Sequence, residues 1–230
     1  TGKATTCAFH HEERDMMAVI HGDDITVLAS QGGVEWVREQ LQARYDIKLS
    51  AVLGPGRSDD KSVRILNRIV TWTENGIEYE ADQRHAELIL QELDLVHAKP
   101  MSTPGTTDRQ PEDDDDTELT GKEGTKYRRL VARLNYIAQD RPDIQYATKE
   151  LCRHMADPRQ ADLRAMKRLA RYLVRRERLI LRYDKQHTSS QTLQITSYAD
   201  ADFAGCRATR KSTSGGVLMN GRHCLKTWGA

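Results

Sequence analysis

Two short apolar runs separated by a polar turn constrain the fold of this chain more than any other feature. The runs cover residues 16–20 and 25–29. Between them stand four polar or small residues: His21, Gly22, Asp23 and Asp24. Each run has the length of a strand, and Gly22 can adopt backbone angles that other residues resist. The pattern therefore predicts a β-hairpin with an Asp pair at its tip.

The predicted hairpin tip is a candidate metal site. The carboxylates of Asp23 and Asp24 would lie close together and repel each other. A divalent cation would remove that conflict by supplying positive charge. Mg²⁺ prefers oxygen ligands and is often held by one or two carboxylates together with substrate phosphates. We therefore take Asp23 and Asp24 as candidate ligands of Mg²⁺ or Mn²⁺. The alternative is an acidic turn that faces water, because Asp is common in turns.

Length and composition narrow the class of protein. A chain of 230 residues can form one large domain or two modest ones. Lys plus Arg (35) nearly cancel Asp plus Glu (34), so the overall charge argues neither for nor against a nucleic-acid partner. There is no long apolar run and no N-terminal signal pattern, so no membrane association is expected. The four cysteines are far apart, which favours reduced thiols in an intracellular protein. The ends of the sequence suggest a piece of a longer protein.

The first third of the chain mixes helix and strand signals. Apolar spacing predicts a helix from about residue 32 to Arg44. Strands are predicted at three runs: residues 45–53, 63–72 and 77–79. Asn75 and Gly76 mark a turn before the last of these. Asp82 is expected to cap a helix that carries Leu88, Leu90 and Leu93.

Residues 100–120 have the composition of a connector. They include Pro104, Gly105, Pro111 and an acidic run at residues 113–116. Blocks of like charge are usually solvated, so we expect an acidic linker here. The alternative is an acidic metal cluster.

Three helices are predicted after this connector, at residues 125–139, 143–155 and 160–176, with Pro142 well placed to open the second. The third is amphipathic, with an apolar stripe through Leu163, Met166, Leu169 and Leu173. Its other face carries cations: Arg164, Lys167, Arg168, Arg171 and Arg175. Such a ridge can track nucleic-acid phosphates. A solvated face or a membrane-surface helix is the alternative.

The final portion returns to strands, predicted at residues 179–183, 193–198, 215–219 and 222–228. Asp200 follows the second of these, and small residues follow Asp200, so a cation would have access to its carboxylate. The alternative is an acidic loop. Asp202 is the fallback ligand. The whole pattern predicts the α+β class.

These motifs occur in the order found in the polymerase polyprotein of Ty1/copia-type retrotransposons. The chain resembles the second half of the reverse transcriptase followed by the beginning of ribonuclease H. Residues 21–25 resemble the aromatic-x-Asp-Asp hairpin of the polymerase palm. Further segments match in order: residues 64–69, 76–90, 102–104, 127–131, 141–144, 165–173, 198–205 and 210–215. Nearly the whole chain from about residue 16 is covered.

The resemblance implies a division of the chain. Residues 1–81 would be the remainder of the palm, with antiparallel strands. Residues 82–99 would leave the palm as the start of the thumb, and residues 100–120 would be the acidic linker. Residues 121–178 would form a three-helix thumb or connection region. Residues 179–230 would be the N-terminal part of a ribonuclease H-like domain.

The resemblance also implies roles and partners. Asp23 and Asp24 would be catalytic residues that bind metal, and Asp200 the first ligand of the ribonuclease H metals. RNA template, DNA primer, RNA–DNA hybrid and dNTP would be the partners. The enzyme would work inside the cell, in a cytoplasmic particle or the nucleus.

Departures from the family pattern limit this reading. His21 stands where the family has Tyr or Phe, Gly22 where Val or Met is usual, and Asn67 where the family has Gly. A third palm Asp would precede residue 1, and further ribonuclease H acids would follow residue 230. We therefore expect the isolated segment to be inactive.

Two other classes of function remain open. The first is a non-catalytic nucleic-acid-binding remnant of a retrotransposon. The second is a phosphatase-like or receiver-like Mg²⁺ domain built on the Asp pair. The turn at Asn75 and Gly76 and the three consecutive helices disfavour that second class.

Overall fold

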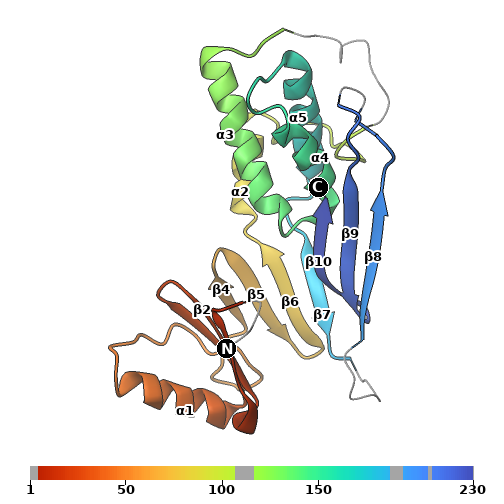
Figure 1. The fold of residues 1–230 in the computed structure, drawn as a ribbon. Coiled ribbons are helices and arrows are strands. Elements are labelled where there is room, and N and C mark those ends of the chain that lie inside the picture. The colour runs from red at the N-terminus through yellow and green to blue at the C-terminus, as the bar shows by residue number, and fades with distance from the viewer. Residues whose placement is uncertain (1–4, 107–116, 187–193, 207–208, 230) are drawn as a thin grey trace. The chain divides into compact units, whose positions relative to one another are not determined.

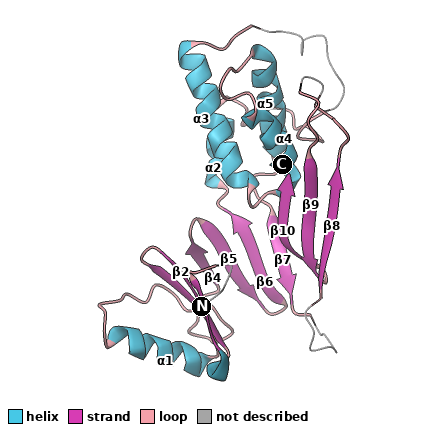
Figure 2. Ribbon diagram, in the orientation of Figure 1, coloured by secondary structure: helices cyan, strands magenta, loops and turns pink. Residues whose placement is uncertain are grey.

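The chain folds into two compact units, residues 1–52 and 53–230, which we describe separately. The structure is a computed structural model and describes residues 5–106, 117–186, 194–206 and 209–229. Five α-helices and three antiparallel sheets lie in the described residues (Figures 1 and 2), in agreement with the predicted α+β class. The acidic run at residues 113–116 lies outside the described residues.

The first unit contains the predicted hairpin. Strands β1 (Ala8–His11), β2 (Met16–His21) and β3 (Asp24–Leu28) form an antiparallel sheet, with a short 3-10 turn, η1 (Glu12–Arg14), between the first two. Helix α1 (Gln31–Gln42) follows, close to its predicted bounds. The Ser30 side chain caps it by accepting a hydrogen bond from the N–H of Gly33 at 3.3 Å. Gly33 lies against buried Met16, so α1 packs on the sheet at this point.

Two of the strand predictions were wrong. Residues 45–53 form no strand; Leu53 makes only an isolated bridge to Asp60. The single strand predicted at residues 63–72 is instead a hairpin of β4 (Ser62–Ile65) and β5 (Arg68–Thr73). Leu66 and Asn67 make the turn with φ of 48° and 62°. Asn tolerates this left-handed region, and two such residues in succession give the turn type that hairpins favour.

The second sheet joins segments about a hundred residues apart in sequence. Its order is β4–β5–β6–β7, with β6 at Gly76–Ala81 and β7 at Ile180–Asp184. The sequence pattern had grouped β7 with the later strands, but it pairs with β6 instead. Glu80, only 6% exposed, receives two hydrogen bonds of 3.0 Å from the Arg178 guanidinium just before β7. A buried carboxylate needs such a partner, so this pair helps to fix the pairing.

Four helices enclose the main hydrophobic core. They are α2 (Arg84–Glu92), α3 (Gly121–Ala138), α4 (Pro142–Cys152) and α5 (Gln160–Leu173). Asp82 accepts a hydrogen bond from the N–H of Arg84 at 3.0 Å at the start of α2, and Pro142 opens α4, both as predicted. Helix α5 ends before its predicted limit because Val174 is extended and Arg175 has φ of 61°.

The core is built from the inward faces of these helices. Its largest fully buried side chains are Tyr127, Ile89, Leu130, Leu134, Ile144, Met166, Leu169, Leu173 and Val131. The predicted apolar stripe of α5 is therefore confirmed for Met166, Leu169 and Leu173. Every helix in the described part of the chain is too short or too polar to span a lipid bilayer.

The last sheet has the order β10–β9–β8 and is antiparallel. Its strands are β8 (Ile195–Ala201), β9 (Ser214–Asn220) and β10 (His223–Gly229). Helix α4 lies beside this sheet: Gln145 Nε2 donates to the carbonyl of Thr227 at 3.4 Å. Lys149 Nζ also donates to the Thr213 hydroxyl at 2.7 Å. The three strands predicted for this portion are confirmed within the described residues.

Candidate metal and nucleic-acid sites

The Asp pair lies at the tip of the β2–β3 hairpin, as predicted. His21 and Asp24 face each other across the strands, and Gly22 and Asp23 form the turn. Gly22 has φ of 59°, which suits a two-residue turn with glycine at its first central position. A Cβ added to Gly22 would meet no atom within 4 Å, so the tip is open around this residue.

Both carboxylates of the tip are exposed. Neither has a hydrogen-bond or ion-pair partner among the described side chains, so both are free to accept a cation. Within the described residues, however, no group of three or more His, Cys, Asp or Glu could hold a metal ion. Asp23 and Asp24 therefore supply two oxygen-donor groups of the kind Mg²⁺ prefers, but not a complete protein cage.

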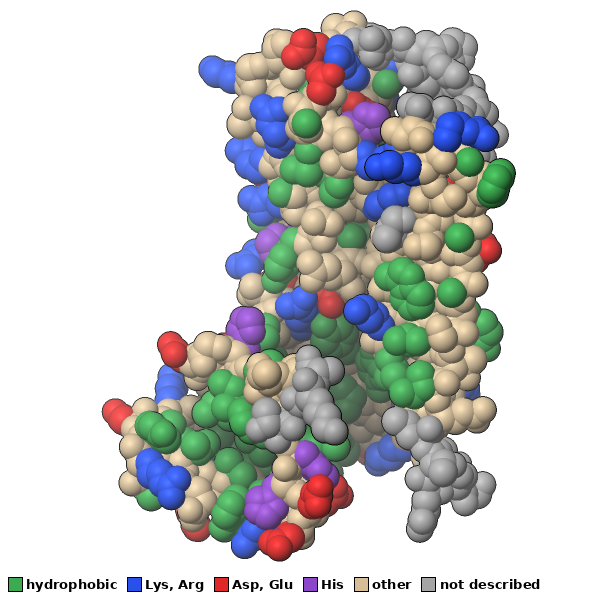
Figure 3. Space-filling view, viewed as in Figure 1, with side chains coloured by type: hydrophobic (Ala, Val, Ile, Leu, Met, Phe, Trp, Pro, Cys, Tyr) green, Lys and Arg blue, Asp and Glu red, His purple; other side chains and the backbone are tan. Residues whose placement is uncertain are grey.

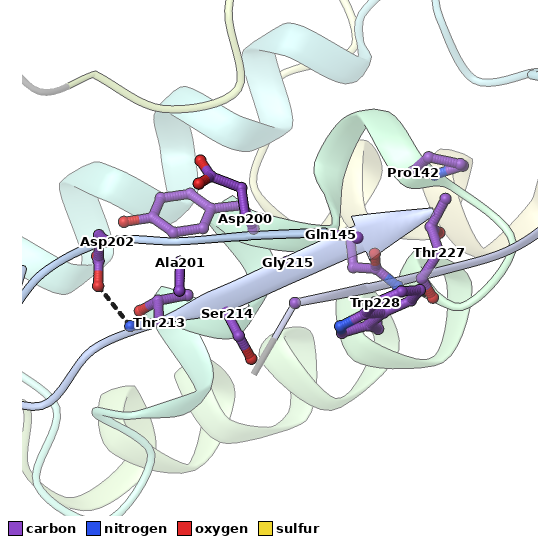
Figure 4. Close-up of a pocket in the computed structure, with 13 residues that line it drawn as sticks. Pro142, Gln145, Asp200, Ala201, Asp202, Thr213, Ser214, Gly215, Thr227 and Trp228 are labelled. Atoms are coloured by element: carbon purple, nitrogen blue, oxygen red, sulfur yellow. Dashed lines mark hydrogen bonds between the residues drawn. The ribbon is translucent and has the colours of Figure 1, made fainter. Parts of the chain in front are cut away.

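Asp200 lies in the wall of a pocket of about 370 Å³ between α4 and the last sheet (Figure 4). It is near the end of β8, opposite Gly215 of β9. Among the described residues its carboxylate has no hydrogen-bond partner. Asp202 differs, because its Oδ1 accepts a hydrogen bond from the N–H of Thr213 at 2.5 Å (Figure 4). Of the two acids that the sequence left open, Asp200 is thus the one with an uncommitted carboxylate.

No site role was predicted from the sequence for the helix and strand residues that form the other walls of this pocket. Helix α4 contributes Pro142, Gln145 and Tyr146, and β10 contributes Trp228. A Cβ on Gly216 would overlap the Trp228 ring at 2.1 Å, so the ring lies directly over this glycine. The motif at residues 141–144 predicted a helix start. It carried no signal that the helix faces a sheet formed some seventy residues later.

The cations of α5 are divided between two environments. Arg168 donates to the Thr103 hydroxyl at 3.0 Å, and Arg171 Nε donates to the Lys99 carbonyl at 2.9 Å. Arg164 is half-buried. Lys167 and Arg175 are exposed, and their side chains have no partner in the described part of the chain. The predicted basic ridge thus contacts the chain's own residues 99–103 over part of its length, and its role in nucleic-acid binding stays a prediction.

A second concave site lies at the start of α2, with a volume of about 520 Å³. Buried Asp82 lies within it, between the guanidinium groups of Arg64 and Arg84. Burial by itself raises the pKa of Asp82. The hydrogen bond from the Arg84 N–H and the charges of the two arginines outweigh burial and hold this pKa below its usual value.

Comparisons with known proteins find similar sequences. The chain is 33% identical over 155 residues to the uncharacterized mitochondrial protein AtMg00810 of Arabidopsis thaliana, which covers 64% of this chain. It is 33% identical over 143 residues to the retrovirus-related Pol polyprotein from transposon RE1 of the same plant, 62% of this chain. A putative transposon Ty5-1 protein, YCL074W of Saccharomyces cerevisiae, is 32% identical over 99 residues, covering 43% of this chain and 31% of that protein. The chain is thus similar to retrotransposon Pol polyproteins, as a fragment of a copia-type Pol polyprotein would be.

The match covers only part of these family members. The chain spans 58% of the mitochondrial protein and 9% of the RE1 polyprotein. No family model and no solved structure matches the chain. The exposed acids at the hairpin tip and in the α4 pocket are oxygen donors of the kind that divalent cations prefer.

Proposed function

We propose that this chain is part of a retrotransposon RNA-directed DNA polymerase and includes the start of its ribonuclease H. The observation that carries the proposal is the hairpin tip, where a glycine turn presents the free carboxylates of Asp23 and Asp24 in a relative of Pol polyproteins. A solvent-facing turn needs only one polar residue, whereas metal binding needs adjacent oxygen donors.

In this proposal Asp23 and Asp24 hold Mg²⁺ or Mn²⁺ in the palm. Bound divalent cations would stabilise the attacking and leaving oxygens of an in-line displacement at phosphorus. Asp23 supplies the stronger ligand and Asp24 a supporting one. The glycine turn keeps both acids at the surface, where a primer end and a dNTP have access to them.

The later segments take the roles that the family suggests. Residues 1–81 are the remainder of the palm, residues 82–99 and 121–178 belong to the thumb or connection region, and the last sheet opens the ribonuclease H-like domain. Asp200 is its first metal ligand, supported by the open pocket beside it. Because β7 pairs with β6, we assign residues 180–184 to the sheet that precedes this domain.

The partners follow from the proposed reaction. They are an RNA template, a DNA primer, their hybrid and dNTP, and the enzyme works inside the cell. We also propose that the 230-residue chain alone does not extend a primer, because its hairpin tip offers two carboxylates and no third acid within the described residues completes the group.

Metal binding by the purified chain tests the proposed palm site. Mn²⁺ should broaden the amide signals of residues 20–25 in NMR spectra, and Asp23→Asn together with Asp24→Asn should abolish the broadening. Asp15→Asn is the matched control, because Asp15 is exposed, lies in the same unit and has φ of 47°, which Asn also tolerates. Broadening that survives in the double variant, or that disappears in the control, would count against the Asp pair.

Activity separates the polymerase from a non-catalytic remnant. In a polymerase that includes the full palm, replacing its corresponding segment with this chain should give primer extension that Asp23→Asn abolishes. The remnant alternative expects no extension in either case, with nucleic-acid binding retained. The exposed cations Lys167 and Arg175 could contact phosphates without catalysis, which supports this alternative.

A further inference from the structure

The outward face of α3 carries a row of cations that the sequence pattern did not single out. Lys122, Lys126, Arg129 and Arg133 follow one another at intervals of four, three and four residues, which places them on one face of the helix. The opposite face is fixed in the core by Tyr127, Leu130, Val131, Leu134 and Ile137. The direction of the cationic row is therefore set by packing. Figure 3 shows Lys and Arg side chains following the outer edge of α3.

Two of the four cations in this row have an acidic partner, and the other two have none in the described part of the chain. Glu92 of α2 pairs with Arg129 and lies 3.8 Å from Arg133. Lys122 and Lys126 are exposed and have no ion-pair or hydrogen-bond partner among the described residues. Helix α5 differs, because Arg168 and Arg171 there donate to the chain's own residues 99–103.

The row continues toward the concave site at the start of α2. The Tyr136 ring, one turn beyond Arg133, contacts His85 at 4.8 Å between ring centroids. Arg84 and Arg64 follow there, with side chains 60% and 53% exposed. From Lys122 to Arg133 alone the helix rises about 16 Å, which is the length of roughly five base-pair steps.

The other exposed residues of α3 identify the kind of partner. They are Gly121, Glu123, Thr125, Ala132 and Asn135, all small or polar. A helix that lies on a membrane needs large apolar side chains beside its cations. A cation at nearly every helical turn, flanked by hydroxyl and amide groups, suits a regularly spaced line of phosphates instead.

We propose that the outer face of α3 is a contact surface for the sugar–phosphate backbone of double-stranded nucleic acid. The proposal rests on the proposed function, because it takes the template–primer duplex as the partner. It assigns the free cations of α3, rather than the occupied arginines of α5, as the main phosphate contacts. Glu92 holds two of the arginines back from that contact.

Fluorescence anisotropy with a 20-base-pair RNA–DNA hybrid tests this surface. The double variant Lys122→Ala, Lys126→Ala should bind more weakly. Its slope of log K against log salt concentration should fall by about 1.8, from two contacts at roughly 0.9 each. The control Arg38→Ala, Arg44→Ala removes the same charge from exposed positions in residues 1–52 and should leave the slope unchanged.

A gain of binding gives the second arm. Glu92→Gln releases Arg129 and Arg133, so it should tighten binding and raise the salt slope by up to about 0.9 for each guanidinium. Glu35→Gln is the charge-matched control, because Glu35 is exposed on α1. A gain of affinity that the control Glu35→Gln does not share separates a contact surface from a simple change of net charge.

The outcomes distinguish this inference from the proposed function. If the double variant and its control bind the hybrid equally well, the α3 surface is wrong and the polymerase proposal is untouched. If the unmodified chain does not bind the hybrid, the result contradicts both the proposed nucleic-acid partner and the α3 surface. If α3 instead mediates binding to phosphatidylserine vesicles with no hybrid binding, the surface belongs to a membrane and the inference is overturned.

Discussion

Asp202 and Thr213 are joined by two hydrogen bonds across the loop between β8 and β9. The N–H of Thr213 donates to Asp202 Oδ1 at 2.5 Å, and the N–H of Asp202 donates to the Thr213 carbonyl at 3.0 Å. The Thr213 hydroxyl in turn accepts from Lys149 of α4. Asp202 therefore links the end of β8 to the helix that borders the pocket, whereas Asp200 takes no part in this linkage.

The two acids should respond differently to substitution. We expect Asp202→Ala to lower the free energy of unfolding by about 1 kcal/mol, because a charge-assisted hydrogen bond is lost at an exposed position. Asp200→Asn should leave stability within about 0.5 kcal/mol, as for a surface change that breaks no contact. Urea unfolding of both variants measures the difference. Equal effects would show that Asp202 does not hold the loop.

Gly76 should be intolerant of any side chain. A Cβ at this position would lie 2.2 Å from the carbonyl oxygen of Tyr183 in the neighbouring strand β7. The obstruction is backbone, so it can be relieved only by moving a strand. We expect Gly76→Ala to cost about 2 kcal/mol or more, since overpacking and backbone strain act together.

Hydrogen exchange locates this effect. Amides of β6 and β7 should lose protection in Gly76→Ala, while those of β4 keep it. Gly32→Ala is the control, because a Cβ at Gly32 in α1 meets nothing within 4 Å. Exchange of glycine for alanine in an open helical position should be neutral or stabilising by up to about 1 kcal/mol. Unchanged protection in Gly76→Ala would mean that β7 does not pair at this position.

Arg141 should contribute to stability through a buried network. Only 2% of this residue is exposed. Its guanidinium makes two hydrogen bonds to Asp143, at 2.9 and 2.7 Å, and donates to the carbonyls of Arg176 and Glu177. Arg141→Ala removes these hydrogen bonds and leaves Asp143 with only the Tyr172 hydroxyl, at 3.1 Å, as a donor among the described residues, so we expect a loss of roughly 3 kcal/mol. Arg141→Lys should recover only part of it, because an ammonium cannot bind a carboxylate in two places.

A double-variant cycle separates this network from loss of packing. If Arg141 and Asp143 act as a pair, the double variant should cost less than the two single variants together. Urea unfolding gives the three values. Strict additivity would show that the two side chains stabilise the fold independently.

Local signals predicted the parts of this fold that depend on neighbouring residues. The Gly22 turn follows from two apolar runs and one glycine, and the start of α4 follows from Pro142, because both depend on a few adjacent backbone angles. Residues 45–53 show the limit. Their apolar content favoured a strand, but the described structure gives them only the isolated bridge of Leu53 to Asp60, and a strand needs a continuous partner.

Features that depend on distant backbone were not predictable from the sequence. The pairing of β7 with β6 joins positions about a hundred residues apart, and either neighbour in sequence was an equally good partner for such a short strand. The acceptor for Arg171 is the carbonyl of Lys99. Every residue has a backbone carbonyl, so the residue types in a sequence cannot predict such a contact. The sequence therefore predicted the individual candidate residues. It did not predict which residues surround Asp200, or that part of the α5 face contacts the chain itself.

The low pKa of Asp82 predicts how stability responds to acid. The carboxylate is buried, yet the N–H of Arg84 and the guanidinium groups of Arg64 and Arg84 favour its charged form. The folded pKa lies below the unfolded one, so the folded state binds the proton less readily. This contribution to stability is complete above the unfolded pKa, about 3.9, and is lost as pH falls through the folded value.

Asp82→Asn should flatten this acid dependence. Urea unfolding at pH 7, 5 and 3 should show the unmodified chain losing stability toward pH 3 more steeply than the variant. At pH 7 the variant should be the less stable of the two, because an amide cannot attract the two arginines. Asp94→Asn is the control, because Asp94 is exposed and has φ of 56°, which Asn tolerates. Asp59→Asn is less suitable, because Asp59 accepts a hydrogen bond from the N–H of Gly56. Parallel curves for the unmodified chain and Asp82→Asn would mean that the carboxylate is not held in its charged form by Arg64 and Arg84.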